Sequence, residues 1–266
     1  MKKVITEEEL QLGIEQGQKI GLNCYTPVSS FLRNLETVLR LILRYYERSD
    51  LLPTIFGVVQ ELISFSCISN MRYIFYERYG YTLDSNEKFL EIEPLFLKEV
   101  SSSKNFSFRE ELIRRKMIVQ TVIEHNDIAL NIKVYNKSEH QLDQEFYIRD
   151  YLRKAMQYSD INEYFADHPE DPQGKNIGLA FSIILLKEAG LRPDLMRFGK
   201  PGIGGYSRIE IPFTNDYQSL RDRILKDESI VPFEKPNLIP EQFRKQFEEH
   251  KKNSKFFAAL DMEIAD

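Results

Sequence analysis

The chain has 266 residues, of which 42% are hydrophobic, so it can form one large domain or one domain with an extension. Its formal net charge of -5 argues against a nucleic-acid-binding protein, because such proteins normally present a basic face. The two cysteines, Cys24 and Cys67, have no metal-binding or redox spacing, and we expect reduced thiols in a cytoplasmic protein.

The N-terminal part is predicted to contain an arm, two helices and a strand. Residues 1–26 are expected to form an irregular arm with a short helix within 7–18. Apolar residues recur at helical spacing over 31–45, and a second helix is predicted from Pro53 to about Ser69. The β-rich stretch 72–77 predicts a strand.

The middle of the chain predicts helices and a hairpin. Helical decoration is expected over 84–116. Strands are predicted at 117–124 and 128–135, joined by a turn at His125-Asn126-Asp127. An amphipathic helix over 142–158 and a short helix within 160–168 are predicted to follow.

The last part predicts a loop, an apolar helix, an edge strand and a tail. Prolines and Gly174 predict the loop before the apolar helix 178–188. The longest apolar run, 177–186, has 10 residues, whereas a membrane span needs about 20, so no span is expected. The alternating segment 207–213 contains a proline and predicts an edge strand.

This interleaving of helices and strands predicts an α+β fold. We expect a two-layer α/β sandwich in which a mixed, mostly antiparallel sheet carries helices on one face. The predicted organisation is an N-terminal arm at 1–26, a domain with helical insertions at 27–213, and a polar helical tail at 214–266, where charged residues and prolines dominate.

Three short blocks in this order carry a family resemblance. They contain Glu61-Leu62-Ile63-Ser64-Phe65, Val134-Tyr135-Asn136-Lys137-Ser138 and Gly174-Lys175-Asn176-Ile177-Gly178-Leu179. Over residues 27–213 the chain resembles the GHKL superfamily of ATP-binding domains, which includes those of sensor histidine kinases, DNA gyrase and heat-shock chaperones. It most resembles histidine-kinase-like proteins of spirochaetes. The resemblance implies a Bergerat-type fold.

In the first block, the family has a glutamate four residues before a Mg²⁺-binding asparagine, on one helix face. Glu61 retains the glutamate as a residual catalytic group, but Phe65 replaces the asparagine. A phenyl ring offers no oxygen to Mg²⁺, which requires oxygen ligands. The alternative for Glu61, favoured beside Phe65, is a partly buried structural carboxylate.

In the second block, the family has an aspartate that accepts a hydrogen bond from adenine, followed two residues later by glycine. Asn136 still carries an acceptor oxygen, whereas Ser138 tolerates positive φ poorly. Adenine recognition is therefore expected to be weakened. An ordinary turn at the end of a strand is an equally good interpretation.

In the third block, the resemblance implies a phosphate loop with the pattern Gly-x-Gly-Leu-Gly-Leu. Asn176 replaces the middle glycine, while Gly174, Gly178 and Leu179 keep their places. Backbone N–H groups near Gly178 can face an anion, and Lys175 can add positive charge. The alternative is a loop and a close helix contact without any ligand.

The resemblance implies a degenerate, histidine-kinase-like pseudo-ATPase with a regulatory or protein-binding role in bacterial signalling. No cofactor is expected, and the protein partner is unknown. The alternative is an active stand-alone kinase or ATPase that uses ATP and Mg²⁺, resembling histidine kinase catalytic domains or anti-sigma-factor kinases. A third interpretation keeps only a cytoplasmic α+β domain. Homodimerisation is common in the superfamily, but the sequence locates no interface.

Overall fold

The computed structural model describes residues 6–81, 86–101, 105–138, 148, 151–169, 177–199 and 205–219. Its strands form one sheet in the order β1-β2-β3-β5-β4. The strands are β1 (Ile20–Cys24), β2 (Val119–His125), β3 (Ala129–Asn136), β4 (Met196–Gly199) and β5 (Gly205–Pro212). The α+β class is thus confirmed, although every described strand pair is antiparallel and the sheet is not mixed.

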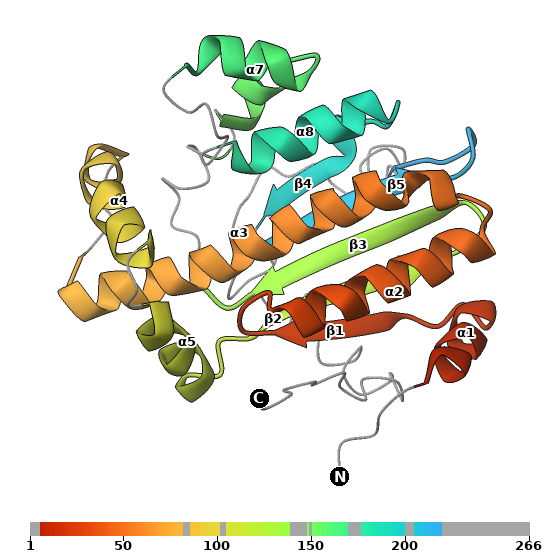
Figure 1. Cartoon of the computed structure of the whole chain (residues 1–266), viewed down its shortest axis with the longest axis horizontal. Coiled ribbons are helices and arrows are strands. Elements are labelled where there is room, and N and C mark those ends of the chain that lie inside the picture. The colour runs from red at the N-terminus through yellow and green to blue at the C-terminus, as the bar shows by residue number, and fades with distance from the viewer. Residues whose placement is uncertain are drawn as a thin grey trace, which may run out of the picture.

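Three helices cover one face of this sheet (Figure 1). They are α2 (Ser29–Tyr45), α3 (Leu52–Tyr79) and α8 (Gly178–Glu188). Alternate side chains of β2, β3 and β5 point toward this layer and are buried, as the period of a strand requires. The helices and the sheet therefore enclose one main hydrophobic core.

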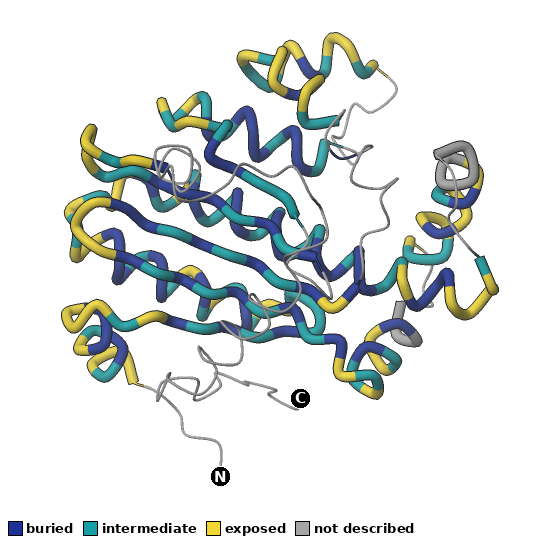
Figure 2. Tube along the Cα trace, turned by 180° about the vertical axis from the view of Figure 1, so that it is seen from behind, coloured by how far each residue is buried: buried dark blue, intermediate teal, exposed yellow. Residues whose placement is uncertain are grey.

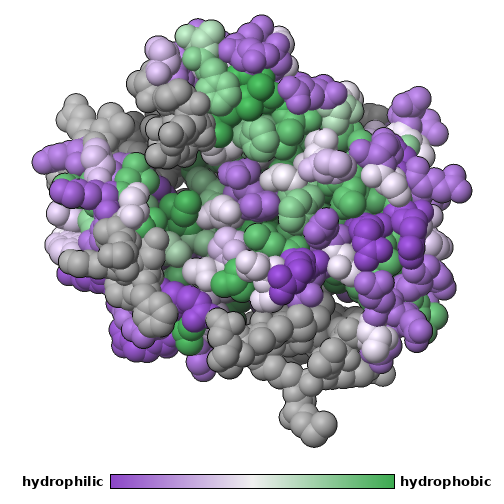
Figure 3. Space-filling view, viewed as in Figure 1, coloured by the Kyte–Doolittle hydropathy of each residue, from purple (hydrophilic) through white to green (hydrophobic). Residues whose placement is uncertain are grey.

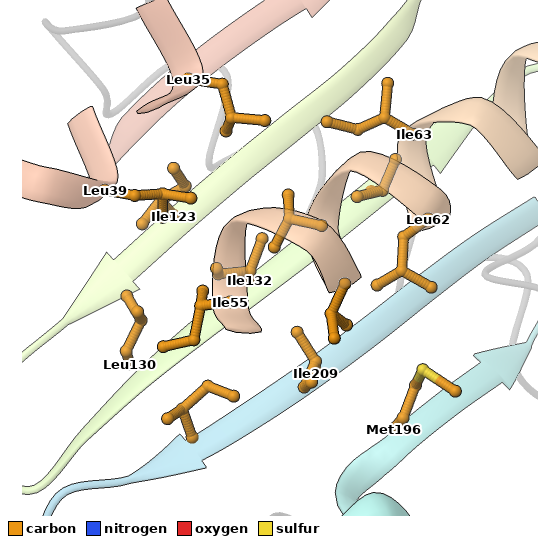
Figure 4. Close-up of a cluster of buried hydrophobic side chains, with 14 of the residues drawn as sticks. Leu35, Leu39, Ile55, Leu62, Ile63, Ile123, Leu130, Ile132, Met196 and Ile209 are labelled. Atoms are coloured by element: carbon orange, nitrogen blue, oxygen red, sulfur yellow. The ribbon is translucent and has the colours of Figure 1, made fainter. Parts of the chain in front are cut away.

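The centre of that core is filled by branched aliphatic side chains (Figure 4). Leu35 of α2 and Ile55 of α3 meet Ile123 and Ile132 from the two central strands, and all four are almost completely buried. Burying a side chain of this kind stabilises the fold by about 1.5–3 kcal/mol. The hydrophobic pattern of the helices therefore fixes which side of the sheet they cover.

Helix α3 is longer than predicted, and the predicted strand at 72–77 is wrong. The helix continues to Tyr79 and ends at Gly80, whose positive φ of 67° suits a glycine cap. Ile74 and Phe75 are buried in a second cluster with side chains of α4 (Asn86–Ser101) and α5 (Asn105–Arg114). Tertiary packing thus overrides the β propensity of this stretch.

The predicted N-terminal arm is part of the domain. Residues before the first core helix form α1 (Glu7–Glu15), which Thr6 caps in a capping box, and then strand β1. Strand β1 pairs along its whole length with β2. Its sequence, Ile-Gly-Leu-Asn-Cys, contains glycine and asparagine, which are poor strand formers, so propensity alone did not predict it.

The predicted edge strand at 207–213 lies inside the sheet. Strand β5 pairs with β3 on one side and with the short β4 on the other. Pro212 occupies the last position of β5, so its missing N–H interrupts little of the ladder. The four-residue β4, which the sequence did not predict, forms the edge instead.

Several other predictions are confirmed. The hairpin of β2 and β3, the helices α4 and α5 within 84–116, and α8 lie where the sequence placed them. The predicted short helix is α7 (Ile161–Asp167), capped by Asp160. Within the predicted helix 142–158, the structure describes residues 148 and 151–158, and 148 and 151–155 are helical. Most of the predicted tail lies outside the described residues.

One described helical stretch, Ser49–Tyr79, is long and apolar enough to cross a membrane by length and composition. In this structure 44% of its most apolar window is buried, and some of its apolar side chains, such as Val58 and Leu62, are fully buried in the main core. The outer surface of the helical layer is mixed: in Figure 3, hydrophilic side chains lie among hydrophobic ones. These features are those of a core helix.

Candidate functional site

Glu61 and Phe65 lie one turn apart on α3, as predicted. The ring of Phe65 meets the ring of Phe198 on β4 edge to face, with ring centroids 5.5 Å apart. Glu61 is half-buried, and this burial raises the pKa of its carboxyl. Its ionised form is therefore poorly solvated, and no ion-pair partner for it occurs among the described residues.

Asn136 and Ser138 are buried where β3 ends, and their side chains contact each other. The Nδ2 group of Asn136 donates a hydrogen bond to Oγ of Ser138. The Oδ1 atom of Asn136 is buried and has no hydrogen-bond partner among the residues that the structure describes. An unsatisfied buried acceptor costs about 1–3 kcal/mol, so this atom keeps the capacity to accept one hydrogen bond.

Asn70 is the residue that sequence reasoning missed. Its side chain is fully buried on α3, and Oδ1 accepts hydrogen bonds from the backbone N–H groups of Lys137 (3.2 Å) and Ser138 (3.0 Å). Its Nδ2 group donates to the carbonyl oxygen of Met117 (3.1 Å). One amide therefore ties the helix to the turn after β3 and to the chain entering β2.

A signal for Asn70 was present in the sequence. Ile63, Cys67, Asn70 and Ile74 follow one another at intervals of four, three and four residues, which is one face of a helix. The incorrect strand at 72–77 hid this pattern, because it ended the helix before Asn70. A polar residue on an otherwise apolar face must satisfy its hydrogen bonds inside the protein.

The third predicted block is only partly described. Gly174, Lys175 and Asn176 lie outside the described residues. Gly178 begins α8 with a φ of 38°, a conformation that glycine adopts without strain. Leu179 is buried in the main core and offers only its backbone to a ligand.

Helix α8 approaches α3 closely beside the first block. A Cβ atom at Gly57 would lie 3.0 Å from a methyl carbon of Leu185, so glycine permits this approach. At the other end of α8, the hydroxyl of Tyr151 donates to the carbonyl oxygen of Ile177 (2.6 Å). The start of α8 is thus held by a side-chain hydrogen bond.

Buried hydroxyl groups lie on the sheet beneath this part of α3. Thr121, Val134, Ser207 and Phe198 are opposite one another in register, across β2, β3, β5 and β4. Within the described part of the chain, the Oγ1 atom of Thr121 and the Oγ atom of Ser207 are buried and have no hydrogen-bond partner. Phe198, which contacts Phe65, is therefore in the same cross-strand row as the hydroxyl groups of Thr121 and Ser207, which can form further hydrogen bonds.

The described residues fit a magnesium–nucleotide complex poorly. Mg²⁺ requires several oxygen ligands, whereas Glu61 brings one carboxylate and Phe65 brings none. Within the described ranges, no group of three or more histidine, cysteine, aspartate or glutamate side chains is arranged to hold a metal ion. At the end of β3, Asn136 Oδ1 is a buried acceptor that could receive a hydrogen bond from the amino group of a base.

The structure therefore connects the helix of the first block to the turn of the second block through Asn70. Glu61 and Phe65 lie on the helix whose Asn70 bonds the backbone of Ser138, and Gly178 begins the helix packed beside it. Comparison with models of protein families, with characterised proteins and with solved structures finds no match for this chain.

Proposed function

We propose that this chain is a degenerate GHKL domain, a histidine-kinase-like pseudo-ATPase that has a regulatory or protein-binding role in bacterial signalling. The observation that carries the proposal is the contact of Phe65 with Phe198. It places an aromatic pair where the resemblance implies a metal-binding amide. A site filled by its own side chains has lost the oxygen ligands and the space that Mg²⁺ and phosphates need.

The hydrogen bonds around Asn136 support the same proposal. Ser138 replaces the glycine of the family pattern, and its hydroxyl and its backbone N–H are both engaged inside the protein. Asn70 holds this turn from the helix side. These contacts stabilise the fold at the place where a base would otherwise be recognised.

One observation favours the alternative, an active ATP-binding protein. Asn136 Oδ1 is a buried acceptor with no partner in the described ranges, and Glu61 is a half-buried carboxylate with a raised pKa. Buried groups of this kind are enriched at functional sites. On the alternative, Asn136 binds the adenine amino group and Glu61 orients a water molecule or a hydroxyl group.

Calorimetric titration with ATP and ADP, with and without Mg²⁺, separates the two functions. We expect no binding heat for the wild-type chain and measurable binding for Phe65→Asn, which restores the missing amide. Phe65→Leu is the matched control, because it removes the ring without adding an oxygen. Mg²⁺-dependent binding by the wild-type chain would overturn the proposal.

We place the protein in the cytoplasm. Both cysteines, Cys24 and Cys67, are buried free thiols, as expected in a reducing compartment. The proposed regulatory role requires a protein partner, and homodimerisation is a further proposal that follows from the resemblance alone. Two alkylation adducts, one on each of Cys24 and Cys67, in protein denatured directly from cells in the presence of a thiol-blocking reagent would support this location, and a disulfide-linked mass without adducts would contradict it.

A further inference from the structure

The face of the sheet opposite α2 and α3 is the most informative surface that the proposed function does not use. Figure 2 shows it from behind, with no described helix crossing the strands. Antiparallel sheets commonly leave such a face solvated, with polar side chains extending into water. We call this surface the outer face and define it by Tyr135, Tyr206, Lys133, Arg208 and Glu210.

Part of the outer face is shielded from solvent. The side chains of Arg208 and Glu210 are only 14% and 1% exposed, and they form an ion pair with an N–O distance of 2.7 Å. Burial raises the pKa of Tyr135 to about 12, with Glu124 and Tyr206 adding to the shift. Desolvation on this scale requires cover above the strands.

The outer face also carries aromatic surface suited to packing. The rings of Tyr135 and Tyr206 stack with centroids 6.1 Å apart, and Tyr206 lies over Gly199, where a Cβ atom would come within 2.7 Å of the ring. Stacked aromatic rings on a sheet contribute most when further apolar side chains exclude water from them.

The described chain ends on this face. After β5, the N–H group of Phe213 donates to the carbonyl oxygen of Ile128 (2.8 Å). The hydroxyl of Tyr217 donates to Glu210 and lies 3.3 Å from Oδ1 of Asn131, so the chain has turned back over β3 and β5. Ser219, the last described residue, is 4% exposed.

We propose that residues 220–266 of this same chain dock on the outer face and cover it. The segment has 47 residues (266 minus 219). Neighbouring strands lie about 4.8 Å apart, so a chain needs far fewer residues than this to cross the five-stranded sheet. It carries the aromatic side chains that such packing needs, namely Phe233, Phe243, Phe247, Phe256 and Phe257. Because the segment begins at the face, docking within one chain is entropically cheaper than recruiting a second molecule.

Cross-linking of the full-length, unmodified chain tests the proposal. Lys133 lies on the outer face, its side chain 21% exposed, and the segment contains Lys226, Lys235 and Lys245. A lysine-reactive reagent is applied to a one-to-one mixture of ¹⁴N- and ¹⁵N-labelled protein. We expect links between Lys133 and the segment that join peptides of the same label only. Mixed-label links would show a second copy on the face, and no link to the segment would show an open face; either result overturns the proposal.

A fluorescence probe gives an independent test, because the chain contains no tryptophan. Tyr206→Trp places a reporter on the outer face, and Tyr73→Trp, on the outer surface of α3, is the matched control. A protease site inserted after Ser219 lets the folded chain be cut and the segment removed. We expect a red shift and several-fold greater acrylamide quenching for Tyr206→Trp alone. Equal quenching before and after removal would overturn the proposal, and quenching that falls with rising protein concentration would assign the cover to a second copy.

Discussion

The ring of Phe65 holds the ring of Phe198 edge to face, and this contact joins the helical layer to the edge of the sheet. Strand β4 has four residues and pairs with β5 alone. A strand so short gains little from its ladder, so side-chain packing from the helix must help to hold it. Phe65 therefore has a structural role at the position where the family resemblance implies a metal ligand.

Removing this ring is expected to destabilise the protein. Phe65→Ala should lower the free energy of unfolding by about 2 kcal/mol, below the range for fully buried phenylalanine because Phe65 is half-buried. Phe65→Leu should cost less than about 1.5 kcal/mol. Urea unfolding followed by circular dichroism measures both. Leu95→Ala, at a side chain that is 50% exposed on α4, is the control and should change little; an equal loss there would remove the assigned role of Phe65.

The side chain of Asn70 is expected to contribute more to stability than that of its polar neighbour Ser69. Asn70→Ala leaves the buried N–H group of Ser138, the buried carbonyl group of Met117 and the partly buried N–H group of Lys137 without their partner, so we expect a loss of about 3 kcal/mol. Hydrogen exchange at Ser138 should accelerate in the same variant. Ser69→Ala, which removes one hydroxyl bonded to the carbonyl of Phe65, is the matched control and should cost less than about 1 kcal/mol. Equal losses for the two variants would contradict this assignment.

Helices with a strong apolar period, such as α2, or with a continuous apolar run, such as α8, could be predicted from the sequence, and short strands could not. The pattern in α2 and α8 is local, so composition and spacing suffice to place them. Strands β1 and β4 are defined by their partners: without β2 and β5 beside them, five and four residues carry no sufficient signal. The prediction of a strand at 72–77 was also wrong because of distant contacts. Side chains of α4 and α5 pack on this stretch and stabilise it as a helix.

The candidate site was predicted as a set of positions, but its internal contacts were not. Sequence spacing placed Glu61 and Phe65 on one helix face, and the structure agrees. Nothing local indicates that Phe65 meets Phe198 or that Asn70 reaches Ser138, because the partners are separated by more than sixty residues. Such contacts follow from the register of the sheet and the path of α3, which only the folded chain defines.

Acid should destabilise the protein partly through His125. This side chain is buried at the end of β2, where Nδ1 lies 2.9 Å from the hydroxyl of Tyr46, and burial lowers its pKa. The unfolded chain therefore binds a proton at higher pH than the folded chain does. Its stabilising contribution is complete above about pH 6.5 and is lost as the pH falls through the lowered value.

Chemical denaturation between pH 8 and pH 5 measures this effect. We expect the free energy of unfolding of the wild-type chain to fall on acidification in that window, and the curve of His125→Gln to be flatter. Loss of packing in His125→Gln lowers its free energy of unfolding by the same amount at every pH. The slope of that free energy against pH reports the proton that His125 binds on unfolding. Parallel curves for the two proteins would show that His125 does not titrate with folding.

Glu61 is expected to show the opposite dependence on pH. Burial raises the pKa of its carboxyl, so the folded chain accepts the proton more readily than the unfolded chain does. The favourable contribution is present below the ordinary pKa and is lost as the pH rises through the raised value. Glu61→Gln, which never ionises, should therefore be more stable than the wild-type chain at pH 7, by less than about 1 kcal/mol, and no more stable at pH 4.

Glu124→Gln is the matched control for Glu61→Gln. Burial raises the pKa of Glu124, but Lys133 and Lys19, which both pair with it, lower it by more. Its removal should therefore destabilise the protein at pH 7. A variant at Glu61 that behaved like the one at Glu124 would show that the Glu61 carboxylate has a favourable contact. A gain in stability at Glu61 would instead show that the chain keeps a carboxylate at a cost to its fold, as proteins do where function requires the group.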